Sequence, residues 1–261
     1  MIVAGVDAGS LSAEAAIVDD KGKVIAQSVV LMGGCSAKAS EEALEVALKE
    51  AGLSMDDLSY IVATGCGREI SPHANSRVTE ITCIARGAFS LYPSCRTIID
   101  IGGQDTKVIR VNERGIVSEF DMNDKCAAGT GRFLEVMANA LGVPLEEMGQ
   151  RSLEFEEDLQ ISSVCTVFAE SEVISLQSQG KAVNDILRGI HKAIADRTVG
   201  LLERIGVEKD VVMTGGVAKN IGVVRAIEEK LGLSLIIPKE PQTVGAIGAA
   251  NIALQKAQTK S

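Results

Sequence analysis

The chain has 261 residues, and 26 Lys and Arg against 35 Asp and Glu give it a formal net charge of −9. This acidity argues against a nucleic-acid partner and against an anionic membrane surface, because both are bound by clustered Lys and Arg. Hydrophobic residues make up 46% of the chain, which is enough for a sizeable core. No apolar stretch reaches the roughly 18 residues of a membrane span. Residues 1–10 lack the features of a signal peptide, so we expect a cytoplasmic protein.

Two segments of the chain repeat one plan of strand, small-residue turn, strand and hairpin turn. The first runs from Asp7 to Gly22 and the second from Asp100 to Gly115, so each covers the same 15-residue separation without a gap. The strands predicted for the two units are 2–7, 13–19 and 23–30, and 97–101, 106–111 and 116–121. A match in register over this length indicates an internal duplication.

Each unit contains an Asp-x-Gly turn that is suited to phosphate binding. Small residues after a strand let backbone N–H groups approach a phosphate, and Asp7 or Asp100 at the strand end can hold Mg²⁺ through water. A single turn of this kind is most often an ordinary connection between strands. Two such turns in register favour a clamp around a polyphosphate, with one turn from each of two lobes.

Helices alternate with short strands along the rest of the chain, as in an α/β fold. Helices are predicted at 38–51, 78–90, 130–141, 168–178, 183–205, 217–230 and 243–257, and further strands at 59–64, 210–214 and 234–237. The acidic segment 150–162 is predicted to be a solvated surface loop. We expect a first lobe over 1–95 and a second over 96–242, with helix 243–257 packing back on the first.

A third glycine element follows the predicted strand 210–214. There Gly215 and Gly216 lead into a helix, and a backbone of this kind can pack against a flat adenine or ribose. The chain has no GxxxxGK[ST] motif, which excludes a Walker-type NTPase. The segment GTGR at 129–132 lacks the third glycine of a dinucleotide-binding fingerprint.

Six cysteines are present and none forms a CxxC pair, which argues against a secreted disulfide framework and against a zinc ribbon. Cys126 and Cys165 each lie near the start of a predicted helix, where the helix dipole stabilises negative sulfur. A twofold dimer would bring four such thiols around one axis, enough to ligate a [4Fe–4S] cluster. Two buried structural cysteines, or a redox pair within one chain, fit the spacing as well. Small buried side chains are expected for Cys35, Cys66, Cys83 and Cys95.

Two phosphate turns followed by a diglycine element resemble the superfamily of acetate and sugar kinases, Hsp70 and actin. Within it, NDKCAAGTGRFLEVMA, SSVCTVFAESEVIS, IDIGGQD and VVMTGGVAKN closely resemble the ATP-dependent activators, or component A, of 2-hydroxyacyl-CoA dehydratases and the related activators of benzoyl-CoA-type reductases. The match runs from Gly5 to about Leu254. The resemblance implies an actin-like, ribonuclease H-like α/β fold, with two lobes that each carry a mixed sheet flanked by helices and with ATP in the cleft.

The same resemblance implies a function. It implies a homodimer with one bridging [4Fe–4S] cluster, ligated by Cys126 and Cys165 of both chains, and one ATP with Mg²⁺ in each subunit. Ferredoxin or flavodoxin would supply an electron, and ATP hydrolysis would drive that electron into an iron–sulfur partner enzyme. A cluster exposed at a dimer axis is expected to be sensitive to oxygen.

Residue by residue, the resemblance assigns a nucleotide site. The matching positions are Asp7, Gly9, Ser10, Leu11 and Ser12 in the first turn, Gly102, Gly103, Gln104 and Asp105 in the second, and Gly215, Gly216, Val217, Asn220 and Gln242 around the adenosine. Asp7 and Asp100 are expected to contact Mg²⁺ through water. Asp7 and Asp105 are the candidate catalytic residues, and Asp105 would orient the attacking water.

The chain departs from the family pattern at two positions. Glu14 stands where a lysine is common, and Cys66 stands where a tyrosine is common. An anion at position 14 would weaken nucleotide binding if it pointed into the cleft, whereas it would have little effect if it pointed to solvent.

Two other readings remain open: a small-molecule kinase on the same fold, and an actin-like or Hsp70-like ATP switch without a cluster. Neither explains the two cysteine segments. His73 and His191 lack acidic or cysteine neighbours at useful spacing and are expected at the surface.

Overall fold

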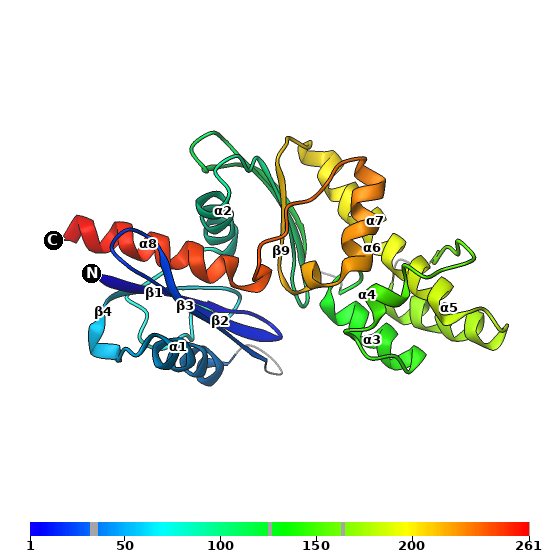
Figure 1. Ribbon diagram of the computed structural model, residues 1–261, viewed down its shortest axis with the longest axis horizontal. Coiled ribbons are helices and arrows are strands. Elements are labelled where there is room, and N and C mark those ends of the chain that lie inside the picture. Colours follow the sequence, from blue (N-terminus) through cyan, green and yellow to red (C-terminus); the bar gives the residue numbers. More distant parts are fainter. Residues whose placement is uncertain (32–35, 125–126, 163–164, 261) are drawn as a thin grey trace.

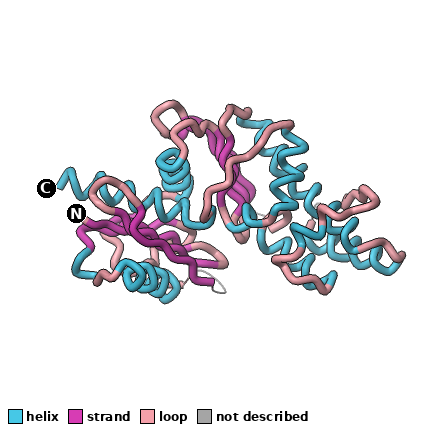
Figure 2. The backbone as a smooth tube through the Cα atoms, in the orientation of Figure 1, coloured by secondary structure: helices cyan, strands magenta, loops and turns pink. Residues whose placement is uncertain are grey.

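The computed structural model describes residues 1–31, 36–124, 127–162 and 165–260. The described chain forms two separate sheets, each with helices packed on it (Figures 1 and 2). Both termini lie at the same end of the molecule (Figure 1). Among the described helices, none combines the length and apolar character needed to cross a membrane.

The first sheet has the strand order β3-β2-β1-β4-β5. Its strands are β1 (Ile2–Ala8), β2 (Ser12–Val18), β3 (Val24–Leu31), β4 (Leu58–Thr64) and β5 (Ser76–Arg77). The strands β1, β2 and β3 form an antiparallel meander, and β4 pairs with β1 in parallel. The four longer strands were predicted to within one residue, because each apolar run ends at a polar or glycine turn. A two-residue strand such as β5 has no periodicity that a sequence could reveal.

Three helices pack against this sheet or beside it. They are α1 (Ala37–Ala51), α2 (Glu80–Leu91) and α8 (Val244–Lys260), and a short 3₁₀ turn, η1 (Met55–Asp57), precedes β4. The C-terminal helix α8 packs on β1, β2 and β4 and crosses α2. Glycines permit these close approaches: a Cβ added at Gly5 would lie 2.1 Å from the Ala246 carbonyl oxygen, and one at Gly87 would lie 2.0 Å from that of Val244. The last helix therefore returns to the N-terminal sheet.

The second sheet has the order β8-β7-β6-β9. Its strands are β6 (Thr97–Ile101), β7 (Thr106–Val111), β8 (Val117–Asn123) and β9 (Val211–Thr214). Strands β6 to β8 form the same antiparallel meander as β1 to β3, and β9 pairs with β6 in parallel. The duplication predicted from the sequence is confirmed in three dimensions. The strand predicted at 234–237 is wrong, because only Ile236 forms a bridge there, to Val212.

The helices of this half are α3 (Gly131–Leu141), α4 (Met148–Arg151), α5 (Thr166–Ser178), α6 (Val183–Ile205) and α7 (Ile221–Leu231), with 3₁₀ turns η2 (Gly216–Lys219) and η3 (Pro241–Thr243). The helix predicted at 217–230 is in fact η2 followed by α7. Asn220 divides the two, because its side-chain oxygen accepts hydrogen bonds from the N–H groups of Gly222 and Val223 at 3.0 and 3.2 Å. Asparagine is a strong helix N-cap, so it starts a new helix here.

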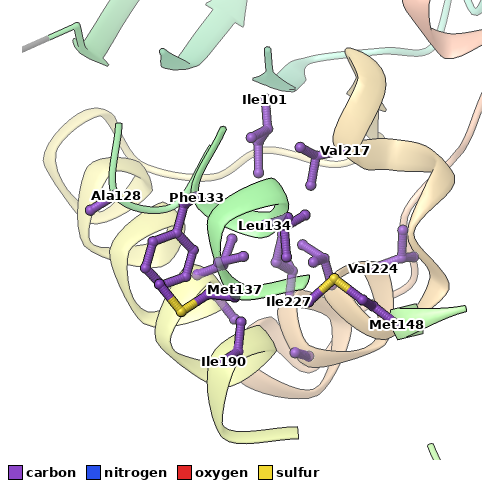
Figure 3. Packing of buried hydrophobic residues seen from close by; sticks show 14 of the residues in the cluster. Ile101, Ala128, Phe133, Leu134, Met137, Met148, Ile190, Val217, Val224 and Ile227 are labelled. Atoms are coloured by element: carbon purple, nitrogen blue, oxygen red, sulfur yellow. The ribbon is translucent and has the colours of Figure 1, made fainter. Parts of the chain in front are cut away.

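A large hydrophobic core lies between the second sheet and its helices. Leu134 and Met137 from α3, Ile190 from α6 and Ile227 from α7 pack together below Ile101 of β6 (Figure 3). The segment 150–162 was predicted to be a solvated loop, and this is only partly correct. Its acidic side chains are exposed, but the first two residues of the segment end α4, Ser152 is buried, and Ile161 belongs to this core.

The prediction that His191 lies at the surface is wrong. The residue lies in α6 and is 0% exposed, whereas His73 is exposed as predicted. Helix α6 packs against β7, β8, α4, α5 and α7 at once. A helix surrounded on several sides buries polar positions that its amphipathic pattern assigns to solvent.

Candidate functional site

A cavity of about 620 Å³ lies between the two sheets, within the usual size range of ligand pockets. Every residue that the sequence assigned to the nucleotide or to Mg²⁺ lines it: Asp7, Gly9, Ser10, Leu11, Ser12, Asp100, Gly102, Gly103, Gln104, Asp105, Gly215, Gly216, Val217, Asn220 and Gln242. These residues come from four separate stretches of the chain. The fold therefore brings the predicted nucleotide residues together in one pocket.

The two phosphate turns, between β1 and β2 and between β6 and β7, face each other across this cavity. A Cβ added at Gly103 would lie 2.6 Å from Cγ of Leu11 and 3.0 Å from Oγ of Ser10. Only a glycine lets the second turn approach the first so closely. A phosphate chain placed between them can reach backbone N–H groups from both sheets.

The diglycine element closes another wall of the cavity at the end of β9. Gly215 has a φ of 83°, and its N–H donates to the Pro241 carbonyl oxygen at 2.9 Å. A Cβ at Gly216 would lie 3.4 Å from Nε2 of Gln242, so these two residues are neighbours despite their separation in sequence. The flat, side-chain-free surface left by the two glycines can accept a planar group.

Carboxylates from both turns gather in the cavity. Burial, and then the nearby charges of Glu14, Glu80 and Asp100, raise the pKa of Asp7 well above its usual value. Burial likewise raises the pKa of Asp100, and Lys107 and a hydrogen bond from Thr214 oppose that rise. The Asp7 carboxylate fits where Gly245 has no side chain, since a Cβ there would lie 2.1 Å from Oδ2.

Glu14 points into the cavity and not to solvent. Its side chain lines the pocket, the residue is only 5% exposed, and Oγ of Ser12 donates a hydrogen bond to it at 2.5 Å. Burial raises the pKa of Glu14 to about 7, although the hydrogen bond from Ser12 and the more distant Lys219 lower it. A carboxyl group therefore stands in the phosphate region, and it becomes an anion only as the pH rises through about 7.

Lys107 is a buried cation of the cavity that was not among the site residues predicted from the sequence. Its Nζ lies 2.6 Å from Oδ1 of Asp105, 2.8 Å from Oε2 of Glu80 and 3.8 Å from Oδ2 of Asp100. Although burial alone lowers the pKa of Lys107, these three carboxylates raise it above its usual value. The signal was present in the duplication, because Lys107 follows Asp100 by the same interval as Glu14 follows Asp7.

The second phosphate turn is joined to the start of α3. The N–H groups of Gly131 and Arg132 donate to the carbonyl oxygens of Gly102 and Gly103, both at 2.9 Å. The N-cap residue Thr130 is fully buried. A shift of this turn would therefore displace the helix that follows the Cys126 segment.

None of the described residues around Cys165 lines the nucleotide cavity, whereas Asp124, Gly131 and Glu135 of the Cys126 segment do. Cys165 is the N-cap residue of α5 and is exposed, whereas Cys126 falls outside the described residues. Val167 and Phe168 in the first turn of α5 are 66% and 70% exposed. Within the described ranges, no group of three or more His, Cys, Asp or Glu side chains could hold a metal ion. A thiol at an exposed helix N-terminus fits a cluster ligand, but one described chain supplies only part of a donor set.

The remaining cysteines differ in their surroundings. Cys83 and Cys95 are fully buried, as predicted, and burial raises the pKa of each thiol to about 12. Cys66 was predicted to be buried but is exposed on the wall of the nucleotide cavity, with its sulfur 3.4 Å from the Ala8 carbonyl oxygen. Cys35 lies outside the described residues.

The chain and its structure are similar to known dehydratase activators. The chain is 50% identical over 260 residues to the activator of lactoyl-CoA dehydratase from Anaerotignum propionicum, covering 100% of both chains. Its structure matches that of the activator of the 2-hydroxyisocaproyl-CoA dehydratase from Clostridium difficile with bound ADPNP, with a TM-score of 0.95, 42% identity and coverage of 100% of this chain and 97% of that one.

The fold alone is shared with a glucokinase of the ROK family from Streptomyces griseus. The two structures match with a TM-score of 0.58 and 16% identity, and the match covers 98% of this chain and 100% of that one. The fold is thus the actin-like ATPase fold predicted from the sequence. Residues 4–253 match the model of the BadF/BadG/BcrA/BcrD ATPase family, and the chain belongs to that family.

Proposed function

We propose that the protein is an ATP-dependent activator that couples ATP hydrolysis to the delivery of a low-potential electron to an iron–sulfur partner enzyme, such as a 2-hydroxyacyl-CoA dehydratase. The observation that carries this proposal is the convergence of both phosphate turns and the diglycine element on one cavity. Ferredoxin or flavodoxin would be the electron donor. A nucleic-acid or membrane partner is not expected, and the cytoplasmic location remains a prediction.

The acidity of the cavity favours Mg-ATP over free ATP as the ligand. Burial raises the pKa values of Asp7, Glu14 and Asp100, which shows that negative charge is unfavourable in this cavity, so the added negative charge of phosphates calls for a cation. Carboxylate oxygens and water are the ligands that Mg²⁺ prefers. Asp7 and Asp100 would hold the ion through water, with one Asp from each phosphate turn.

Asp105 would orient the water that attacks the terminal phosphate. Its Oδ1 lies 2.6 Å from the ammonium of Lys107, so the carboxylate is held in one direction and kept as an acceptor. Asp7 lies on the opposite turn and would act on the phosphates through the Mg²⁺ ion that it helps to hold. Positioning and charge stabilisation of this kind supply most of the catalysis in phosphoryl transfer.

The link between the second turn and α3 supports coupling to the cysteine segments. Hydrolysis changes the charge between the turns, and Gly102 and Gly103 are bonded to the first N–H groups of α3. Helix α3 in turn packs against α5, which begins after Cys165. A movement of the second turn would therefore alter the relative positions of the two helices that follow Cys126 and Cys165.

Cys126 and Cys165 of two subunits would together hold one [4Fe–4S] cluster at a twofold axis. The cluster supplies one-electron chemistry when it is bound. Exposed apolar side chains next to Cys165, those of Val167 and Phe168, support a protein contact at this end of the molecule. Cys165 would contribute its thiolate sulfur, which the N-terminus of α5 stabilises.

The test is the iron and acid-labile sulfide content of the anaerobically purified protein, together with its mass in solution. About two irons per chain in a dimer are expected, since four are shared by two chains. Cys165→Ser should lose the iron and keep ATP binding, because the cysteine lies outside the nucleotide cavity. Cys95→Ala, at a buried cysteine that packs in a different hydrophobic cluster from α3 and α5, is the matched control and should keep the iron.

Two outcomes would contradict the proposal. Absence of iron after anaerobic reconstitution, in a protein that hydrolyses ATP, would favour a kinase or an ATP switch on the same fold. Loss of ATP binding together with iron in Cys165→Ser would instead assign that cysteine a structural role.

A further inference from the structure

A buried polar pair lies behind the cavity wall, where α6 meets the start of α7. Nε2 of His191 is 3.3 Å from Nδ2 of Asn220. Asn220 lines the cavity, whereas His191 is 0% exposed and does not reach it. The histidine is thus in contact with a residue of the nucleotide site without being part of it.

The hydrogen bonds of Asn220 establish which atom faces the histidine. Its Oδ1 accepts from the N–H groups of Gly222 and Val223, at 3.0 and 3.2 Å, and so caps α7. The side-chain amide nitrogen must therefore point away from the helix and toward His191. An amide nitrogen only donates, so Nε2 of His191 must be the acceptor.

The imidazole is consequently neutral and carries its proton on Nδ1. Burial, together with the positive charge of Arg188, lowers the pKa of His191 to about 3, in agreement with a neutral ring. Its Nδ1 is buried and has no hydrogen-bond partner among the described residues. A buried donor without a partner lowers stability. The ring is therefore held in an orientation that serves the bond to Asn220 and leaves its other nitrogen unsatisfied.

Close packing prevents the pair from rearranging. A Cβ added at Gly222 would lie 2.3 Å from Nδ1 of His191, so the ring lies directly against the backbone of α7. Arg188, one turn earlier on α6, forms an ion pair with Glu229 of α7. The two helices are thus in contact at the histidine itself and joined by an ion pair one turn away from it.

The location of Asn220 identifies the part of a nucleotide it can reach. Because the two glycine turns take the phosphates, the nucleoside must occupy the rest of the cavity, which Leu145, Gly216 and Asn220 line. We propose that His191 is a positioning residue for the nucleoside: by accepting a hydrogen bond from Asn220, it holds that amide in the orientation that binds ligand. The inference rests on the proposed nucleotide site and is independent of the cluster.

The experiment compares ligands with and without a nucleoside. Dissociation constants for Mg-ATP, Mg-ADP and magnesium tripolyphosphate are measured by calorimetry on the full chain. His191→Leu and His191→Met both remove the acceptor, and we expect each to weaken ATP and ADP binding about tenfold, the value of one hydrogen bond. Tripolyphosphate binding should be unchanged. His191→Gln keeps an acceptor and should recover most of the affinity.

Two controls separate positioning from general damage to α6. Thr198→Val alters another buried polar residue of the same helix, whose hydroxyl donates to the Ile194 carbonyl oxygen, and should leave the binding of all three ligands unaffected. In Asn220→Ala, a further His191→Leu change should have no additional effect, because the amide it positions is gone.

Unchanged ATP binding in both acceptor-free variants would overturn the inference, as would equal loss of ATP and tripolyphosphate, or a similar loss in Thr198→Val. These results differ from a failure of the proposed function, in which the unaltered protein would bind no ATP.

Discussion

The two repeats, β1–β3 and β6–β8, have the same backbone but opposite charge at one equivalent position. Asp7 pairs with Glu14 across the first hairpin, and Asp100 pairs with Lys107 across the second. Both meanders turn at a glycine with positive φ, 77° at Gly22 and 70° at Gly115. Glu14 and Lys107 are both buried, so neither is a solvated surface residue.

The difference shows that backbone and charge are set by different parts of the structure. Glycines and apolar runs determine the strand, turn and hairpin, and these are alike in the two repeats. The surroundings of the two ionisable side chains differ between the repeats. Lys107 is surrounded by three carboxylates, one of which is that of Glu80 from α2. Glu14 has Ser12 as its hydrogen-bond donor.

The largest effect is expected when the cation of the second repeat is removed. Lys107→Met would leave the buried carboxylate of Asp100 and the half-buried carboxylate of Asp105 without this cation, and the free energy of unfolding should fall by about 3–5 kcal/mol at pH 8. ATP hydrolysis should be lost, because Asp105 is no longer held. Denaturant unfolding measures the first effect and phosphate release the second.

The control is Lys219→Met, another lysine of the cavity. Its ammonium is largely exposed and pairs with Glu240 at 2.9 Å, so a loss below about 1 kcal/mol is expected. Equal destabilisation by the two lysine variants would show that burial of Lys107 has no special energetic role.

The equivalent glycines of the two turns offer a second comparison. A Cβ at Gly9 would lie 2.7 Å from the backbone oxygen of Ser12, whereas one at Gly102 would lie 3.0 Å from a side-chain oxygen of Asp105. A side chain can move more readily than backbone, so Gly9→Ala should weaken ATP binding more than Gly102→Ala, by about tenfold, or ~1.4 kcal/mol. Titration calorimetry with Mg-ATP ranks the two, and the reverse order would contradict this account.

Removing the charge of Glu14 should stabilise the first repeat at high pH. The folded pKa of about 7 lies above the usual 4.5, so the native state favours the protonated form, and stability is lost as the pH rises from about 4.5 through 7. Glu14→Gln should therefore raise the free energy of unfolding by about 2 kcal/mol at pH 8 and have little effect at pH 4.5. It should also tighten Mg-ATP binding. A pH-independent difference in unfolding would show that the carboxylate does not titrate in this range.

The smallest effects are expected at the hairpin turns. Asp19 accepts hydrogen bonds from the N–H groups of Lys21 and Lys23, and Asn112 accepts them from those of Arg114 and Ile116. Alanine at either position should lower thermal stability slightly and leave ATP binding unchanged.

The two hairpins should differ in their dependence on pH. Backbone hydrogen bonds lower the pKa of Asp19, so its contribution is present above the usual value of 3.8 and is lost as the pH falls through the lowered one. The effect of Asn112→Ala should not depend on pH. Melting curves at pH 3 and pH 7 test the contrast, and identical behaviour of both variants would contradict it.

Most elements could be predicted because their signals are local. Strands of the two repeats end at glycine or polar turns, and long helices such as α6 show a clear period. The failures have non-local causes. The segment 234–237 has a strand-like composition but pairs at one residue, and Asn220 divides a helix because its side chain caps the backbone there.

For the site, the sequence by itself determined which residues could bind a nucleotide, because glycine turns and strand-end carboxylates are defined by a few neighbouring positions. Only the tertiary structure decided the electrostatics. Lys107 meets Glu80 from α2, Glu14 points into the cavity, and His191 is buried against Asn220. Burial and charge pairing depend on segments far apart in the chain, and it is these that set pKa values and the direction of each polar side chain.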